Sequence, residues 1–311
     1  MKLFNNLNPN CKPRSLRDLL KWKLTVRNPK WPKKILLENY DMPPPIITEP
    51  NKIRVTWVGQ ATFLMQIDGF NILTDPIWSK RSSPFKYFGP KRVIEPGIKL
   101  KDLPKIDIIL ISHNHYDHLD LNTIKFIWQR DQPRIITPLM NDIIMQDILV
   151  HTLNWQENII INNSLSIHLE PSQHWSARGL FDRNRALWGN FIIKTKDYDI
   201  FFIGETGYSE QLYKDIGLKY NIFLSIIPIG AFEPRWFMQD MHMTPEEAVL
   251  THKDLKSKYS IASHFQTFQL GSESYLQAPT ELNYALEKYQ IIHNNFILPK
   301  CGQAYWFNIN N

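Results

Sequence analysis

His113-Asn114-His115-Tyr116-Asp117-His118 places three imidazoles and one carboxylate within six consecutive residues. The stretch directly follows residues 106–111, an apolar run that predicts a buried strand ending in a loop. Imidazole nitrogen and carboxylate oxygen are the ligands that hold zinc and, with less preference, iron or manganese. A solvated turn is the alternative, but a turn requires no histidine. The stretch therefore predicts a metal site on a strand-end loop.

The composition is that of an ordinary globular protein. With 311 residues, of which 43% are hydrophobic, the chain is long enough for one large domain or two smaller ones. Only two cysteines occur, Cys11 and Cys301, which excludes a disulfide framework and favours a reducing, cytoplasmic compartment. The first residues lack the apolar region of a secretory signal, and no apolar run reaches the roughly 20 residues that span a bilayer.

The positive charge is concentrated at the N-terminus. Residues 1–40 hold ten Lys or Arg and two acidic residues, a local charge of +8, which leaves −2 for the other 271 residues of a chain with net charge +6. We interpret residues 1–45 as a basic, aromatic leader that ends in a triple-proline linker, and residues 46–311 as the main folded domain. The leader could lie on an anionic membrane surface, bind nucleic acid, or wrap around the domain.

The first strands are predicted at residues 53–58, 63–67 and 70–74, with Asp68-Gly69 as the turn of a hairpin. Asp75 ends the third strand. There it could orient a metal-bound histidine through the second ring nitrogen, or only cap a turn. Residues 77–105 have no clear period and predict a long surface loop, of a kind that often borders active sites.

The remaining chain alternates short helices and strands. We expect a helix from Asp120 to about Gln129, a strand at residues 134–137, a second helix near residues 141–149, and strands with turns between residues 159 and 170. Two blocks of strands interleaved with helices suggest two sheets packed face to face with helices outside.

Three further side chains follow predicted strands, as the opening stretch does. His174 lies at the end of one strand, Glu205 follows the buried-type strand at residues 198–203, and His264 follows residues 260–263. Each is a candidate to complete the metal site. His242 instead precedes a helix start at Thr244-Pro245, where it could donate to a substrate phosphate, protonate a leaving group, or simply pack. We expect ordinary structural roles for the other four: His151, His168, His252 and His293.

At this point the chain resembles the metallo-β-lactamase superfamily, whose signature is an H-x-H-x-D-H loop with later His, acid and His ligands at strand ends. The likeness extends to the N-acylphosphatidylethanolamine-hydrolysing phospholipase D family from about Leu16 to Leu270. It is carried by residues 73–76, 89–92, 112–120, 174–176, 187–189, 204–208 and, most specifically, 229–238 with 245–248.

The resemblance implies an α/β fold, an αββα sandwich with two divalent metal ions, usually zinc. By position, one metal would be held by His113, His115 and His174, and the other by Asp117, His118 and His264. Glu205 would bridge the two ions. Asp117 and His242 are the candidates for catalysis. The reaction implied is attack of a metal-bridging hydroxide on a glycerophospholipid, giving phosphatidic acid and an N-acylethanolamine.

The same resemblance suggests where a phospholipid substrate would bind. We predict substrate contacts at Trp175, Arg178, Arg235 and Trp236, with the arginines facing the phosphate. The neighbouring Phe237 and Met238 would extend an apolar entrance for acyl chains. The alternatives are salt bridges within loops for the arginines and core packing for the apolar residues.

Three positions depart from the family pattern. Glu205 stands where the family has aspartate, Gln60 stands where a histidine follows glycine, and Phe265-Gln266 replaces Trp-Gly. Because glutamate is one methylene longer, it could still bridge both ions or bind one of them only.

Three functions follow as hypotheses. The first is hydrolysis of N-acylated phospholipids, with the protein peripherally associated with a membrane. The second is hydrolysis of a soluble ester, lactone or phosphodiester, and the third is a catalytically impaired metal-binding or membrane-binding homologue. A nucleic-acid substrate is disfavoured because the body carries a charge of only −2. A homodimer is a candidate assembly.

Overall fold

In the computed structural model, which describes residues 3–11, 14–37, 39–49 and 51–309, two seven-stranded sheets face each other. The first sheet runs in the order β14 (Ala304–Asn308), β1 (Lys52–Gly59), β2 (Thr62–Ile67), β3 (Phe70–Thr74), β4 (Ile108–Leu110), β5 (Arg134–Pro138), β6 (Val150–Leu153). The second runs in the order β13 (Phe296–Ile297), β12 (Tyr259–Ser263), β11 (Ile222–Pro228), β10 (Asp199–Phe202), β9 (Asn190–Lys194), β8 (Ser166–Glu170), β7 (Asn158–Ile160).

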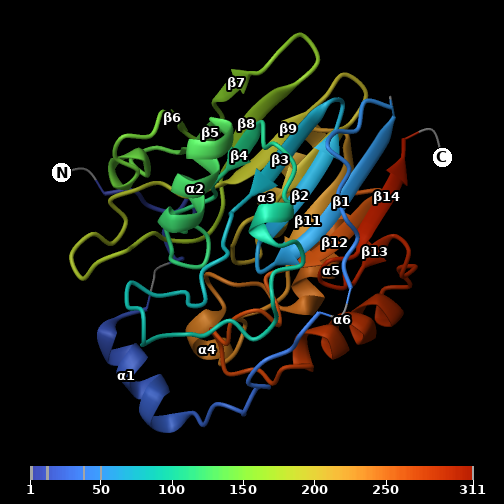
Figure 1. Cartoon of the computed structure of the whole chain (residues 1–311). Helices are drawn as coiled ribbons and strands as arrows, with labels where there is room; N and C mark the ends of the chain where they lie inside the picture. Colours follow the sequence, from blue (N-terminus) through green and yellow to red (C-terminus); the bar gives the residue numbers. More distant parts are fainter. Residues whose placement is uncertain (1–2, 12–13, 38, 50, 310–311) are drawn as a thin grey trace.

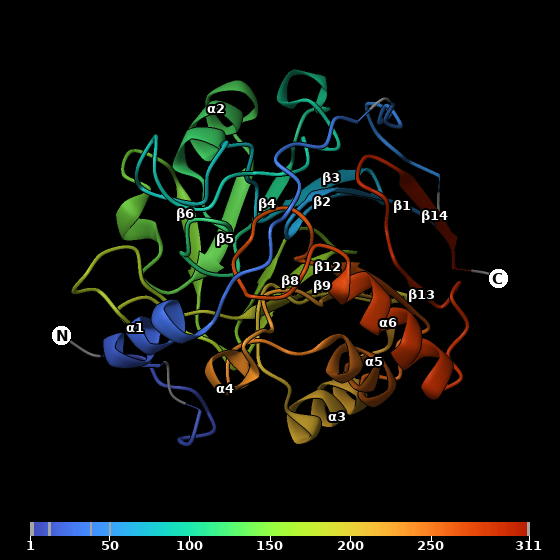
Figure 2. The same cartoon turned by 90° about the horizontal axis from the view of Figure 1, so that it is seen from below.

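Helices cover the outer faces of both sheets (Figures 1 and 2). Over the first sheet lies α2 (Leu121–Asp131), which buries Ile124 and Ile127. Over the second lie α3 (Glu210–Lys219), α5 (Pro245–Asp254) and α6 (Gln277–Lys288). The remaining helices are short or peripheral: α1 (Leu16–Thr25), α4 (Arg235–Met238), and the 3-10 turns η1 (Leu100–Asp102) and η2 (Asp142–Ile144). The predicted αββα sandwich is confirmed.

Side chains from both sheets form one core between the layers. Many of its members are fully buried β-branched or aromatic residues, which favour the pleated, half-buried surface of a strand. The Asp68-Gly69 turn is present as predicted, with φ of +46° and +80°, the left-handed values that a two-residue hairpin turn requires. The capping box at the start of α5 is also confirmed, since Thr244 and Glu247 cap each other's backbone amides.

The helix predicted near residues 141–149 is wrong. Only the single turn η2 forms, and Asp147 adopts φ +65°, which ends any helical path. Asn141 does not cap a helix, because its side-chain amide donates to the carbonyls of Pro138 and Leu187 at 2.8 and 2.9 Å. These tertiary contacts replace the local bonds that a helix would have needed.

The N-terminal leader lies along the body over much of its length. Ser15 caps α1, and Trp22 on this helix is buried and donates to Ser272 Oγ at 2.7 Å. The proline linker is held by Gln66 and Asn71, whose amides donate to the carbonyls of Pro44 and Pro45 at 2.8 and 2.7 Å. In the described part of the chain, no helix has the length and apolar character needed to cross a membrane.

Candidate metal centre

The carboxyl ends of strands from both sheets deliver the predicted ligands to one edge of the sandwich. The opening stretch follows β4, His174 follows β8, Glu205 follows β10, and His264 follows β12. The strands β8, β10 and β12 run in the same direction, because β9 is antiparallel to both β8 and β10, and β10–β11–β12 are parallel. Their carboxyl ends therefore meet at one edge, opposite the end of β4.

One cluster contains three imidazoles and one carboxylate: His113, His115, His174 and Glu205. The His115 Nδ1 atom lies 2.8 Å from His113 Nε2 and 3.3 Å from His174 Nε2. The Glu205 Oε2 atom lies 2.9 Å from His174 Nε2 and 3.4 Å from His113 Nε2. These four atoms surround a single point, as the ligands of one metal ion would.

A second cluster contains Asp117, His118, His264 and the same Glu205. The His264 Nε2 atom lies 3.2 Å from both Asp117 Oδ2 and His118 Nε2. The Glu205 Oε1 atom lies 3.1 Å from His264 Nε2, while its Oε2 atom lies 3.4 Å from His118 Nε2. Glu205 is thus the one residue common to both clusters.

The donor set fits two divalent metal ions. In each cluster the ligand atoms lie within 4.8 Å of one another, and all but His115 are buried. Converging imidazole nitrogens and carboxylate oxygens are the donor set that a zinc-like ion accepts. The two buried clusters are therefore consistent with the predicted binuclear site.

The electrostatics keep His113, His174, Asp117 and Glu205 in the forms that bind metal, whereas His118 is held protonated and would release its proton to bind an ion. Burial lowers the pKa of His113 well below its ordinary value and that of His174 to about 4, so both imidazoles are neutral at neutral pH. Burial opposes ionisation of Asp117 and Glu205, but the surrounding histidines hold the pKa of both carboxyls well below the ordinary range. Burial likewise opposes a charge on His118, but Asp117 and Asp75 raise its pKa well above the ordinary value.

Asp75 lies directly behind the second cluster. Its Oδ2 atom lies 2.6 Å from His118 Nδ1, and the side chain also accepts from the Ser112 backbone N–H at 2.7 Å and from Ser112 Oγ at 2.6 Å. This is the outer contact that orients a ligating imidazole. Gly204 allows it, because a Cβ there would lie 2.3 Å from Ser112 Oγ.

His242 lies at the open side of the centre, between α4 and α5. Its Nδ1 atom is 2.9 Å from Glu205 Oε1, and its ring stands nearly perpendicular to that of His174. Arg235 holds this segment, since it donates to the His242 carbonyl at 2.8 Å and to both carboxylate oxygens of Glu247 at 2.9 Å.

The predicted substrate contacts lie around this opening, but several already contact other protein groups. The Arg178 guanidinium donates to the carbonyls of Asn114 and Leu119 and stacks 4.0 Å from the centroid of the Tyr116 ring. Arg178 therefore stabilises the loop that carries His113 to His118. The Trp175 ring contacts His115, with centroids 4.5 Å apart. Trp236 lies further out, below the ammonium group of Lys21. Binding of substrate by these four residues stays a prediction.

Two contacts at the centre escaped the sequence analysis. The Asn6 side chain in the leader pairs with the backbone of His174, accepting from its N–H at 3.0 Å and donating to its carbonyl at 2.9 Å. Ser112 links Asp75 to His113, with its Oγ 2.9 Å from His113 Nδ1. The position of Ser112, between a buried strand and the first ligand, was a usable signal, whereas nothing in the sequence marks Asn6. The four histidines expected to be structural belong to neither cluster.

Comparison with known proteins agrees with this geometry. Residues 70–265 match the model of the β-lactamase superfamily domain. The chain belongs to the metallo-β-lactamase superfamily. It is 38% identical over 239 residues to N-acyl-phosphatidylethanolamine-hydrolyzing phospholipase D 1 of Caenorhabditis elegans, a match covering 73% of this chain and 67% of that protein.

Other members of the superfamily are also similar. The mitochondrial N-acyl-phosphatidylethanolamine-hydrolyzing phospholipase D of Saccharomyces cerevisiae is 33% identical, with 81% of this chain and 56% of that protein covered. An uncharacterized protein of Mycobacterium tuberculosis is 34% identical, with 82% and 69% covered. The solved metallo hydrolase Igni18 of Ignicoccus hospitalis superposes with a TM-score of 0.63 at 20% identity, covering 83% of this chain and 99% of that one, which shows the shared fold.

Proposed function

We propose that this protein is a phosphodiesterase of phospholipase D type, which cleaves N-acylphosphatidylethanolamine-like lipids into phosphatidic acid and an N-acylethanolamine. The observation that carries the proposal is the position of Glu205, whose carboxylate contacts ligands of both clusters. A bridging acid is what a paired-metal centre needs. The named activity of the two phospholipase relatives supports the choice of substrate.

When bound, two ions in this centre would supply hydroxide at neutral pH and neutralise charge on the phosphate oxygens. The residues of the chain then have distinct tasks. Asp117 is held ionised and accepts a hydrogen bond from the Gln60 amide at 2.9 Å; it would hold the second ion and accept a proton from water. We assign to His242, whose Nδ1 lies 2.9 Å from Glu205 Oε1, the donation of a proton to the leaving ethanolamine oxygen.

A small cavity beside His242 is suited to the lipid end of such a substrate. It has a volume of about 250 Å³ and lies between α1 and the α4 segment. Its apolar walls include Leu19 and Trp22 from the helix and Phe237 from α4, while Arg14 and Arg183 add positive charge. An apolar wall beside two guanidinium groups matches an acyl chain joined to a phosphodiester.

The exposed face of α1 supports approach to a membrane surface. Leu16, Leu20 and Leu24 follow one another at four-residue spacing and are 72%, 61% and 85% exposed. The helix and its flanks also carry several Lys and Arg residues. An apolar ridge flanked by basic side chains favours a helix lying at an anionic lipid surface, so we infer peripheral membrane association.

The test is lipid turnover by metal-loaded protein on vesicles that contain N-acylphosphatidylethanolamine and an anionic lipid. We expect release of N-acylethanolamine and phosphatidic acid, with loss of activity in H115A and full activity in H293A, which removes a histidine outside both clusters. H242N should keep both metals but lose about 10²- to 10⁴-fold in rate, the usual contribution of a general acid.

Three results would count against the proposal. Negligible lipid turnover by wild-type protein that holds two metals would refute the lipid substrate. Turnover of soluble esters or phosphodiesters by the same preparation, with no binding to the vesicles, would assign the centre to a soluble substrate instead. Failure to retain metal after gentle purification would indicate an impaired homologue.

A further inference from the structure

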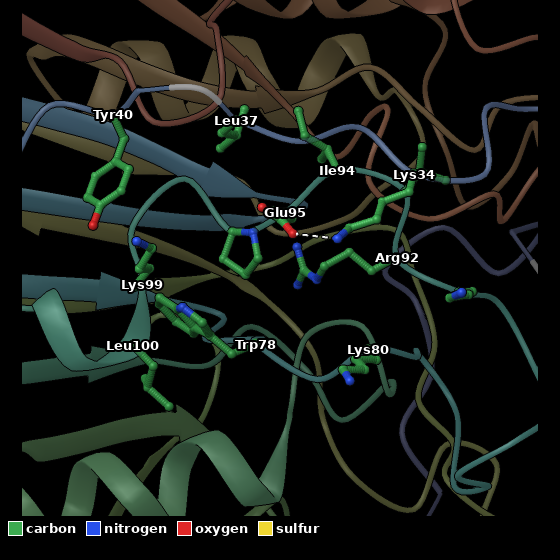
Figure 3. A pocket seen from close by; sticks show the side chains of 13 residues that line it. Lys34, Leu37, Tyr40, Trp78, Lys80, Arg92, Ile94, Glu95, Lys99 and Leu100 are labelled. Carbon is green, nitrogen blue, oxygen red and sulfur yellow. Dashed lines mark ion pairs between the residues drawn. The ribbon is translucent and has the colours of Figure 1, made fainter.

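A second cavity lies between the leader and the long loop that follows Asp75 (Figure 3). Its volume of about 550 Å³ falls within the range of pockets that bind small molecules. None of its thirteen lining residues belongs to the metal-ligand clusters. The cavity is therefore separate from the metal centre and has no part in the proposed reaction.

The leader forms one wall of this cavity. The Ile35 N–H donates to the Val93 carbonyl at 2.7 Å, and the Glu95 N–H donates back to the Ile35 carbonyl at 3.2 Å. Further along, the Tyr40 hydroxyl donates to Asp102. These bonds hold the leader over the loop and leave a defined space between them.

One part of the cavity is apolar. In Figure 3, Leu37 and Tyr40 of the leader lie opposite Trp78 and Leu100 of the body. The Trp78 indole is fixed, because its N–H donates to the Ile98 carbonyl at 2.8 Å. The fixed indole offers a large apolar contact at a small cost in conformational entropy, and the Lys99 ammonium group lies over the Tyr40 ring at 5.6 Å.

Another part is strongly cationic. Five lining residues are Lys or Arg, and the single acid, Glu95, is paired with Lys34 at 2.9 Å. The ammonium groups of Lys80 and Lys91 form no ion pair with any residue that the structure describes. Arg92, only 8% exposed, is anchored by a 2.7 Å bond to the Ile77 carbonyl and adds a fixed positive charge to this part of the wall.

Because the cavity has an apolar part and a cationic part, we propose that it binds a small amphiphilic anion. The phosphate or carboxylate head of this anion lies beside Lys80, Lys91 and Arg92. Its apolar body lies between Trp78 and the leader. The positively charged side chains that lack an ion-pair partner attract one acidic group. The apolar wall beside them contacts the apolar part of the same molecule. The proposal does not depend on the identity of the reaction at the metal centre.

The test measures binding of monooctyl phosphate and of octanoate to metal-free full-length protein, below the concentrations at which these compounds form micelles. Metal-free protein is used so that no metal ion can bind the head group at the metal centre. The two compounds distinguish a phosphate head from a carboxylate head. We expect at least one of them to bind, at least about tenfold more tightly than its four-carbon analogue, because the longer chain buries more apolar surface.

The double variant K80E/K91E should weaken this binding at least about tenfold through charge reversal. The matched control is K125E/K196E, which reverses two exposed lysines outside the cavity and should change affinity less than about twofold. Absence of binding by both compounds at millimolar concentration would overturn the proposal. So would equal weakening in both double variants, or equal affinity for the short and long chains.

Discussion

Replacing Asp75 by asparagine should weaken metal binding most strongly at the second cluster, which Asp75 contacts directly, and less at the first, which it reaches only through Ser112. The wild-type carboxylate is fully buried and contacts His118 Nδ1 at 2.6 Å as well as the backbone N–H and hydroxyl of Ser112. Asparagine keeps the shape and one acceptor oxygen but removes the charge that orients the His118 ring. Loss of such an outer contact typically costs 10- to 100-fold in metal affinity, which is about 1.4 to 2.7 kcal/mol.

The assay is competition for zinc between a chromophoric chelator and the protein, which resolves two binding steps. In D75N we expect the two steps to shift unequally, one of them by about 10- to 100-fold and the other by clearly less. Thermal unfolding of the metal-free forms is the control, because a general loss of structure would lower the melting temperature as well. An equal shift of both steps, or no shift of either, would refute the reasoning that Asp75 acts through His118.

Further predictions follow from the same contacts. E205Q should weaken both metal-binding steps, in contrast to D75N, because its carboxylate contacts both clusters; metal analysis after dialysis checks this. Removal of the metals should lower the unfolding free energy by about 2.7 kcal/mol for each ion, or about 5.4 kcal/mol for two, relative to protein with free metal at 100 times the dissociation constant of each site; urea unfolding measures this. Burial lowers the pKa of His252 in the folded protein to about 4, below the ordinary value of 6.5. As the pH drops from 6.5 toward 4, this residue is therefore protonated in the unfolded chain but not in the folded protein, and the free energy of unfolding falls. Between pH 7 and 5 the loss of unfolding free energy in H252Q should be about 2 kcal/mol smaller than in wild type.

The sequence could indicate which side chains converge, because the segments that carry them follow strands. A buried strand is recognisable from an apolar run, and the residue after it must appear at a sheet edge. His113, Glu205 and His264 obey this rule, since they follow β4, β10 and β12 within a few residues. At these residues the local sequence pattern also indicates the position in the fold, so the candidate site could be predicted from the sequence.

Contacts made by irregular segments could not be predicted in the same way. Asn6 reaches the backbone of His174 across 168 positions of sequence, and no periodicity marks a loop residue for such a contact. The missing helix near residue 141 has the same cause, because Asn141 is bound to Leu187, 46 positions away. Where a side-chain amide donates to a distant carbonyl, this tertiary contact determines the local structure more strongly than helix propensity does.

The three departures from the family pattern form one connected group on the side of the second cluster. Gln60 donates to Asp117 Oδ2 at 2.9 Å, its carbonyl accepts from the His264 backbone N–H at 3.0 Å, and its amide nitrogen lies 2.8 Å from His264 Nε2. Phe265 stacks on Trp57, whose indole N–H donates to the same Gln60 carbonyl at 2.9 Å.

The longer Glu205 completes this arrangement. Its Oε1 atom faces His242 and His264, while its Oε2 atom faces His174. The Glu205 carboxylate lies between the two clusters, and the Gln60 amide lies beside Asp117 and His264. Gln60 and Glu205 thus both contact His264, and Phe265 packs on Trp57, which is bonded to Gln60.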